Sequence, residues 1–322
     1  MNASERRLRV RRWLAGQRCV YTPNVWDPMS ARVAEDVGFE LGLLSAHGAE
    51  WAINGGNEMC RVTITELADV CRRIYRATEL SILVTGPWGF GNAINDARYV
   101  EELELAGASI ITIGDIALPL GFRSAAEIRP LDTADHERRR QPLDPGVASA
   151  GHDYDIDLQP AVPLNEYVGR VKAALAARRD PSLVIAARTN ALMVGDISAA
   201  LDRMKAYEAA GVEAVWFSSP SRSGIEAVRA ATTIPLIVGG SVWNEWSGSV
   251  QEIRACLDQI GVRVASVGSV NLRAVARTLV ESFIAMRDGD RAHLTEMAIP
   301  KADFERITHL ARDNEMVGAF LN

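Results

Sequence analysis

The sequence has few cysteines, and it has neither a long apolar run nor an excess of positive charge. The four cysteines, Cys19, Cys60, Cys71 and Cys256, form no CxxC pair and match no zinc-binding spacing. We therefore expect buried, reduced thiols in a cytoplasmic protein. No apolar run approaches the roughly 20 residues that cross a bilayer, which excludes a membrane-spanning class.

The net charge, the N-terminal segment and the chain length also restrict the class of protein. The chain of 322 residues carries 35 Lys and Arg against 41 Asp and Glu, a net charge of -6, so it lacks the basic footprint of a nucleic-acid-binding protein. Segment 1–12 is rich in arginine but has no apolar core, so it predicts an amphipathic docking helix and not a secretory signal. The length allows one large α/β barrel or two ordinary domains.

Short apolar segments alternate with longer helical patterns, which predicts βαβ units and a parallel sheet. The eight strand candidates are Cys19–Val25, Leu41–His47, Ser81–Thr85, Ser109–Asp115, Leu183–Asn190, Ala214–Ser219, Pro235–Gly240 and Arg263–Ser269. The helix candidates between them are Asp27–Asp36, Thr65–Thr78, Ala93–Ala106, Leu164–Ala177, Asp196–Ala210 and Gly224–Ala231. The fold class is therefore α/β, with a (β/α)8 TIM-type barrel as the leading architecture. An open doubly wound sheet is the alternative, but the dinucleotide fingerprint that such a sheet would carry near its first strand is missing.

Two segments fall outside the repeat. Residues 129–163 lack periodicity and are rich in proline, and they follow the fourth strand, so they predict either a lid over the active site or an inert insertion. After the barrel, 1–270, the chain continues through 271–322 as a helical extension, with a helix expected over Leu272–Arg287 and a further helical region over Leu294–Val317. A closed barrel does not need this extension, so we expect it to serve a homo-oligomer, either a dimer or a tetramer.

Several motifs point to one family. They are, in order along the chain, Asn24-Val25-Trp26-Asp27-Pro28-Met29-Ser30-Ala31-Arg32, Val37-Gly38-Phe39-Glu40, Gly89-Phe90-Gly91-Asn92-Ala93, Leu103-Glu104-Leu105-Ala106-Gly107-Ala108, Ala187-Arg188-Thr189-Asn190-Ala191 and Ala206-Tyr207-Glu208-Ala209-Ala210-Gly211. In these motifs and their order, the chain resembles the isocitrate lyase and phosphoenolpyruvate mutase superfamily, and within it the oxaloacetate decarboxylase branch, over roughly residues 13–290.

The resemblance implies a barrel whose C-terminal helix is swapped between subunits, usually in tetramers. It also implies an enzyme that makes or breaks a C–C or C–P bond next to an α-keto acid or related carboxylate. In the family, a magnesium ion held by acidic residues stabilises the developing enolate.

The residues that should hold this magnesium are largely replaced. Where the family has Asp-Ala-Asp after the third strand, the chain has Thr85, Gly86 and Pro87, and where the family has Glu-Asp after the fourth strand, it has Gly114-Asp115. Magnesium requires hard oxygen ligands, so we expect no cofactor; Asp115 and Glu58 are the only candidates if a metal binds. The alternative for Asp115 is a helix cap or a salt bridge. The cysteine of the isocitrate lyases is also missing from 117–122.

Three residues are candidates for catalysis. The resemblance assigns Arg188 to the anionic end of the substrate, which suits the paired donors of a guanidinium; a structural salt bridge to Glu58 is the alternative. His47, expected at the end of the second strand, could act as an acid or base, or be a packed histidine. Asp115 is the third. The candidates for substrate binding are Ser45, Ala46, Gly48, Thr85, Trp88, Asn190 and Ser241.

Three functions remain open at this stage. The first is a lyase-type enzyme that acts on a C–C bond beside a carboxylate or keto acid through an altered, magnesium-independent site. The second is a magnesium-dependent oxaloacetate decarboxylase, carboxylic-acid lyase or phosphomutase-like enzyme. The third is a non-catalytic paralogue that binds a small carboxylate. We favour the first, because several metal ligands are replaced together while Arg188 and Asn190 are retained.

Overall fold

A computed structural model of the chain describes residues 1–56, 61–86, 91–116, 161–192, 196–218, 220–240 and 246–321. The described strands form one eight-stranded sheet with the spatial order β1-β8-β7-β6-β5-β4-β3-β2, and neighbouring strands in this order are parallel. The strands are β1 Val20–Thr22, β2 Leu41–Ser45, β3 Ser81–Thr85, β4 Ile110–Gly114, β5 Val184–Thr189, β6 Ala214–Ser218, β7 Leu236–Gly239 and β8 Val262–Ser266.

The sheet closes into a barrel through the short first strand. Beyond Thr22, the backbone pairs with β2: Val25 N donates to Leu43 O, and Leu43 N donates to Pro23 O, both at 2.9 Å. The predicted (β/α)8 TIM-type fold is therefore confirmed. Each predicted strand overlaps an observed one, and the differences lie at their ends.

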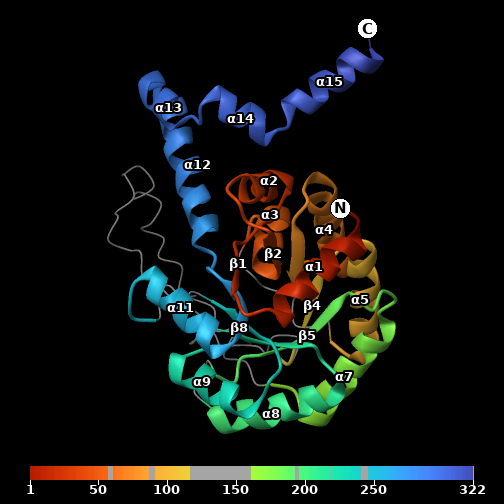
Figure 1. Cartoon of the computed structure of the whole chain (residues 1–322). Helices are drawn as coiled ribbons and strands as arrows, with labels where there is room; N and C mark the ends of the chain where they lie inside the picture. The colour runs from red at the N-terminus through yellow and green to blue at the C-terminus, as the bar shows by residue number, and fades with distance from the viewer. Residues whose placement is uncertain are drawn as a thin grey trace, which may run out of the picture.

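Helices follow the strands and surround the barrel (Figure 1). Around it lie α1 Ala3–Ala15, α2 Pro28–Asp36, α3 Ala46–Asn54, α4 Ile64–Ala77, α5 Ala93–Leu105, α7 Leu164–Ala177, α8 Ile197–Ala210, α9 Arg222–Ala231 and α11 Val250–Ile260. Gly107 and Gly211 end their helices in the left-handed conformation, with φ of 95° and 94°, where a glycine is favoured.

One predicted boundary is wrong. The second strand was expected to run through His47, but β2 ends at Ser45 and α3 begins at Ala46. The Ser45 side chain caps this helix by accepting a hydrogen bond of 2.9 Å from Gly48 N. His47 therefore lies in the first turn of a helix and not in a strand.

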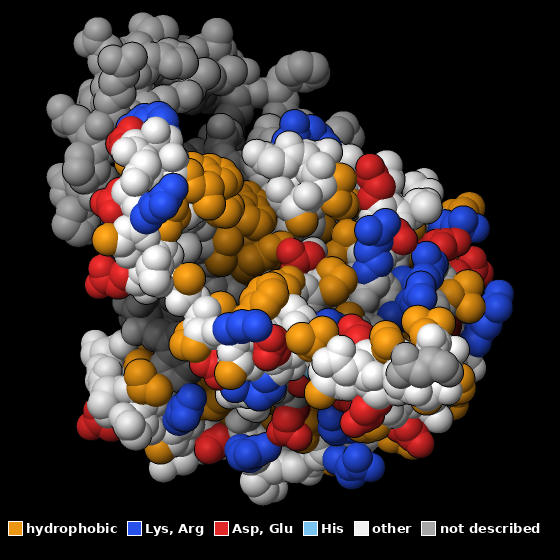
Figure 2. Space-filling view, turned by 90° about the horizontal axis from the view of Figure 1, so that it is seen from above, with side chains coloured by type: hydrophobic (Ala, Val, Ile, Leu, Met, Phe, Trp, Pro, Cys, Tyr) orange, Lys and Arg blue, Asp and Glu red, His pale blue; other side chains and the backbone are white. Residues whose placement is uncertain are grey.

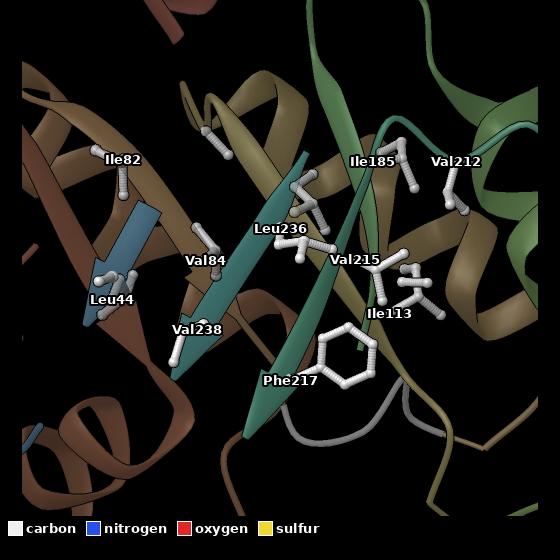
Figure 3. Packing of buried hydrophobic residues seen from close by; sticks show 14 of the residues in the cluster. Leu44, Ile82, Val84, Ile113, Ile185, Val212, Val215, Phe217, Leu236 and Val238 are labelled. Carbon is white, nitrogen blue, oxygen red and sulfur yellow. The ribbon is translucent and has the colours of Figure 1, made fainter. Parts of the chain in front are cut away.

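Alternate strand residues build two separate apolar layers. One layer lies between strands and helices; Figure 3 shows Leu44, Ile82, Val84, Ile113 and other members on neighbouring strands. The second layer fills the barrel and includes Leu43, Leu83, Ile110, Val184, Ala186, Ala214, Trp216, Ile237 and Val264. Since side chains alternate along a strand, membership of these layers fixes which strand residues face inward.

Helix α1 closes the amino-terminal end of the barrel. Val10 and Leu14 enter the inner layer. Arg7 Nε donates to Ala108 O at 2.9 Å, and Arg11 Nε donates to Ser182 O at 2.9 Å, so arginines satisfy carbonyl groups just before the strands. The predicted docking helix is thus confirmed, and α1 leaves the carboxyl ends of the strands at the opposite end of the barrel.

The C-terminal extension leaves the barrel. It consists of α12 Val270–Asp288, α13 Arg291–Met297, α14 Lys301–Ile307 and α15 Leu310–Phe320, and Figure 1 shows α12 pointing away from the strands. The helical region predicted over Leu294–Val317 is helical, but it is divided among α13, α14 and α15: Pro300 precedes α14, and His309, at φ 61°, precedes α15. None of the described helices is long and apolar enough to cross a membrane.

Candidate active site at the carboxyl ends of the strands

The end of the barrel opposite α1, called here the C-terminal mouth, is lined mainly by small polar side chains. The alternation set by the two apolar layers turns one residue near the end of each strand inward. These residues are Thr22, Ser45, Thr85, Gly114, Arg188, Ser218, Gly239 and Ser266. Arg188 is the only charged residue among these eight positions. These eight positions therefore combine one cation with several hydroxyl groups.

Arg188 lies on β5 between Gly114 of β4 and Trp216 of β6, its partners in the strand register. Its guanidinium carbon is 5.9 Å from the centre of the Trp216 ring, and the indole is nearly buried. The Arg188 backbone is fixed as well, because its N–H donates to Tyr167 Oη at 3.1 Å and its carbonyl accepts from Asp115 N at 3.1 Å. The candidate substrate-binding arginine is thus held at a fixed point of the mouth.

Asp115 faces the opposite side of β4, toward α8. Its Oδ2 accepts hydrogen bonds from Tyr207 Oη at 2.8 Å and from Arg203 Nη1 at 3.2 Å. Burial raises the pKa of this carboxyl, while the Thr189 hydroxyl, Arg203 and Tyr207 act to lower it. The arrangement is a buried ion pair between the barrel and a helix, which was the alternative considered for this residue.

The described donors at the strand ends of the mouth do not fit the family's magnesium site. Thr85 occupies the inward position at the end of β3, and Gly114 occupies that of β4, so neither supplies a carboxylate. Among the described residues there is no cluster of three His, Cys, Asp or Glu side chains that could hold a metal. A lone hydroxyl is a weak ligand for magnesium, which requires several hard oxygens.

The residues after β2 are brought to the same mouth. Ser45 is the register neighbour of Thr85, and Ala46 and His47 follow it in the first turn of α3. Gly48 is not available to a ligand through its N–H, because that group already donates to Ser45 Oγ. The backbone N–H of Ala46, the first residue of α3, points out of the helix start, as at any such position. It is a backbone donor of this region suited to an anion.

Two inward residues were missed by the sequence analysis. Thr112 is register partner of Thr85, and its buried hydroxyl has no hydrogen-bond partner within the described part of the chain. Trp216 lies beside Arg188. Both lie in strands that are buried on both faces, so the sequence shows no alternation that would separate inward-facing from outward-facing residues. Asn190 is buried after β5, and so is Trp246 in the segment after β7, where its Nε1 donates to Pro220 O at 3.1 Å.

Other expectations lie outside the described residues: Glu58, Trp88, Ser241 and nearly all of the predicted lid, 129–163. The base of the insertion is described. Ile116 pairs with Ala161 in an antiparallel bridge, and Val162 N donates to Asp115 O at 2.7 Å. Arg203 Nη2 also donates to Val162 O at 2.9 Å, so the Asp115–Arg203 pair fixes the point where the chain returns to the barrel.

Comparison with known proteins identifies relatives over nearly the whole chain. The family model described as phosphoenolpyruvate phosphomutase matches residues 10–140 and 149–287. An oxaloacetate decarboxylase of Bradyrhizobium sp. (strain BTAi1 / ATCC BAA-1182) is 35% identical over 316 residues, which cover 95% of this chain and 96% of the relative. An oxaloacetate decarboxylase of Rhodopseudomonas palustris (strain BisB18) is 40% identical over 241 residues, 74% of this chain and 73% of the relative.

Solved structures share the fold. A phosphonopyruvate hydrolase in complex with oxalate and Mg²⁺ superimposes with a TM-score of 0.78 at 22% identity and covers 100% of both chains. An oxaloacetate acetylhydrolase in complex with the product oxalate gives a TM-score of 0.76 at 18% identity, with 99% of both chains covered. At these identities the likeness concerns the barrel and not its chemistry.

Proposed function

The chain belongs to the phosphoenolpyruvate mutase/isocitrate lyase superfamily, and we propose that this lyase makes or breaks a C–C bond next to a carboxylate or keto acid without magnesium. Its membership makes it a carbon–carbon lyase-type enzyme. The proposal concerns the manner of catalysis. Arg188 replaces part of the positive charge that a metal ion would provide, and the hydroxyl groups around it complete the polar lining.

The observation that carries this proposal is the set of side chains that face the C-terminal mouth. A guanidinium donates two parallel hydrogen bonds to a carboxylate, and Arg188 is the one charged group among the eight inward strand-end positions. In a lyase of this kind, electron density develops on the oxygen atoms next to the bond that breaks. A fixed cation in a water-poor site stabilises that charge more strongly than it would in water.

Magnesium chemistry is disfavoured by the identity and direction of the donors. Thr85 and Gly114 stand where two strand ends face inward, and the Asp115 carboxylate is turned to Arg203 and Tyr207. If Asp115 left these partners to reach a metal, Arg203 would lose its counter-ion in a partly buried place. We therefore assign Asp115 to the framework that supports the mouth. His47, in the first turn of α3, is our candidate for the proton-transferring group.

Oxaloacetate is the first substrate to assay, because the two relatives above are oxaloacetate decarboxylases. Carbon dioxide release would be measured in EDTA and, separately, with added magnesium, with an enzyme-free reaction subtracted in each condition. We expect equal rates in both. Arg188→Ala should lower kcat/KM by about 100-fold or more, and Arg188→Lys should recover only part of it, because lysine lacks the planar pair of donors.

Arg222→Ala is the matched control, since Arg222 is an exposed arginine at the start of α9 that pairs with Glu226. It should keep the parent rate. Activity that disappears in EDTA and returns with magnesium would make the enzyme an ordinary metal-dependent decarboxylase of the family. An Arg188→Ala variant with the parent kcat/KM would remove Arg188 from the site.

We further propose that the extension 271–322 binds a second copy of the chain. The eighth helix of a closed barrel normally covers its last strand, but in α12 only Leu272 and Ala285 are buried. Figure 2, which looks down on the side of α13–α15, shows hydrophobic side chains gathered on this face among charged ones. A second copy that donates its own α12 would cover such a surface.

A further inference from the structure

Trp216 occupies a place in the barrel that only a large flat side chain can fill. It lies on β6, one strand from Arg188, with 4% of its surface exposed. Its Nε1–H donates to Ser218 Oγ at 3.3 Å, two residues along the same inward face. The indole therefore points from the interior of the strand toward the C-terminal mouth.

The neighbouring strand is shaped to receive this ring. Gly239 on β7 is the register partner of Ser218, and a Cβ atom built on Gly239 would overlap Cζ2 of Trp216. Its backbone φ is not in the left-handed region, so the glycine is required here by space and not by conformation. The ring thus extends along the inner wall from Arg188 on β5 to the backbone of Gly239 on β7, which has no side chain.

We propose that Trp216 is a positioning residue for Arg188, and that Gly239 makes this possible. The inference rests on the proposed function, since it assumes that Arg188 binds the carboxylate of the substrate. The indole face lies 5.9 Å from the guanidinium carbon, within the range in which a ring attracts a cation. The hydrogen bond to Ser218 and the contact with β7 hold the ring, and the ring limits where the guanidinium can move.

The same ring also restricts what can bind. It fills the part of the mouth between β5 and β7 with an apolar wall, next to the small residues Ser218 and Gly239. A carboxylate on Arg188 would therefore have an apolar surface on its β6–β7 side. Among the described side chains, a second anionic group of a substrate that pointed in that direction would lose its solvation against the indole and meet only the hydroxyl group of Ser218. The structure thus favours a carboxylate whose remaining substituent on that side is small and uncharged.

The test uses oxalate as a carboxylate probe, titrated into the full-length protein by calorimetry in EDTA. Trp216→Phe keeps a flat ring and should weaken binding by about threefold or less, whereas Trp216→Leu removes the ring and should weaken it by about tenfold. The measured quantity is Kd. A purely structural loss would lower the number of binding sites but leave the Kd of the folded molecules unchanged.

Trp13 provides a matched control at the other end of the barrel. It packs against the inner layer, and Arg9 lies over its ring at 5.3 Å, so it forms a similar arginine–tryptophan pair far from the mouth. Trp13→Leu should leave the Kd for oxalate unchanged even if it lowers the melting temperature. If Trp216→Leu also leaves the Kd unchanged while Arg188→Ala weakens binding, the positioning role is wrong and the proposed function stands.

If the parent protein does not bind oxalate, or if Arg188→Ala binds it as tightly as the parent, the proposed function fails and the inference fails with it.

A double-mutant cycle adds an independent check. Gly239→Ala should displace the ring and weaken oxalate binding by about tenfold in the parent, but change it by less than about twofold in the Trp216→Leu background. Equal effects in both backgrounds would overturn the proposal, because Gly239 would then act independently of the ring.

Discussion

At the scale of single residues, the most deeply buried ion pair of the described chain joins two helices. Asp96 on α5 and Arg170 on α7 are 0% and 1% exposed, and Arg170 Nε lies 2.6 Å from Asp96 Oδ2. Burial raises the pKa of Asp96 to about 6, although the hydrogen bond and charge of Arg170 act to lower it. Burial thus affects the pKa of this carboxyl group more strongly than Arg170 does.

This imbalance predicts opposite results for a single and a double substitution. Arg170→Met leaves a buried carboxylate without its cation and should lower the free energy of unfolding by about 3–5 kcal/mol. Adding Asp96→Leu should restore at least half of that loss, because an apolar pair of similar size pays no desolvation cost. Urea unfolding of both variants is the measurement. A double variant less stable than Arg170→Met would mean that the pair is net stabilising.

Individual residues also mark the limit of what the sequence can predict. The sequence placed Gly114 and Asp115 at the end of the fourth strand, and they are there. It could not say which of the two faces the interior, because a parallel strand buried on both faces has no alternation of apolar and polar residues. Asp115 therefore kept two interpretations, a metal ligand and an ion pair, until the outer layer and Arg203 fixed its direction.

At the scale of elements, α1 is held to the barrel by charged groups distant in sequence. Asp180, in the turn before β5, accepts from Arg7 Nη1 at 2.8 Å and from Ser4 Oγ at 2.7 Å. Partial burial acts to raise the pKa of Asp180, but hydrogen bonds from Ser182, Arg7 and Ser4 together hold it well below its usual range. The ionised carboxylate is therefore the form that fastens the helix.

Asp180→Asn should thus lower the free energy of unfolding at pH 7 by about 1.5–3 kcal/mol. Because the folded-state pKa lies below the unfolded value near 3.9, the stability that the carboxylate contributes is present above about pH 4 and is lost as the pH falls further. The gap between parent and variant should narrow accordingly in urea titrations below pH 4. Asp69→Asn, which breaks an exposed pair with Arg73, should change stability by less than about 0.5 kcal/mol. A gap that is constant with pH would contradict this account.

Helices with a strong apolar periodicity were predicted well, whereas a helix whose start depends on a capping side chain was missed. Leu164–Ala177 was expected as a helix and is α7 with the same bounds. Helix α3 was missed, because Ala46–Asn54 contains a glycine and follows the apolar run of β2 without a break. Ser45 caps this helix because the end of β2 holds its hydroxyl group beside Gly48 N, and local sequence does not specify that position.

At the scale of the whole molecule, the eightfold repeat of strand and helix fixed the barrel, because parallel strands need crossover helices and eight of them close. The same repeat does not determine where the last helix goes. α12 starts after β8 and leaves its own barrel, while α14 returns to α2, where Arg306 pairs with Asp36 at 2.8 Å. Since only Leu272 and Ala285 of α12 are buried, we propose that a second surface stabilises this helix, and no local sequence pattern specifies that surface.

Phe283 tests whether this surface belongs to a second copy of the chain. It lies on α12 with 61% of its surface exposed, near Leu279 and Met286, one helical turn away on either side. Phe283→Asp places a charge in the proposed interface and should shift the protein to a smaller assembly in light scattering coupled to gel filtration. Ile94→Asp, at an 80% exposed apolar position on α5, is the matched control and should keep the parent mass. A monomeric parent would contradict the proposed role of the extension. If Phe283→Asp kept the parent mass, the subunits would have to associate through another face of the barrel.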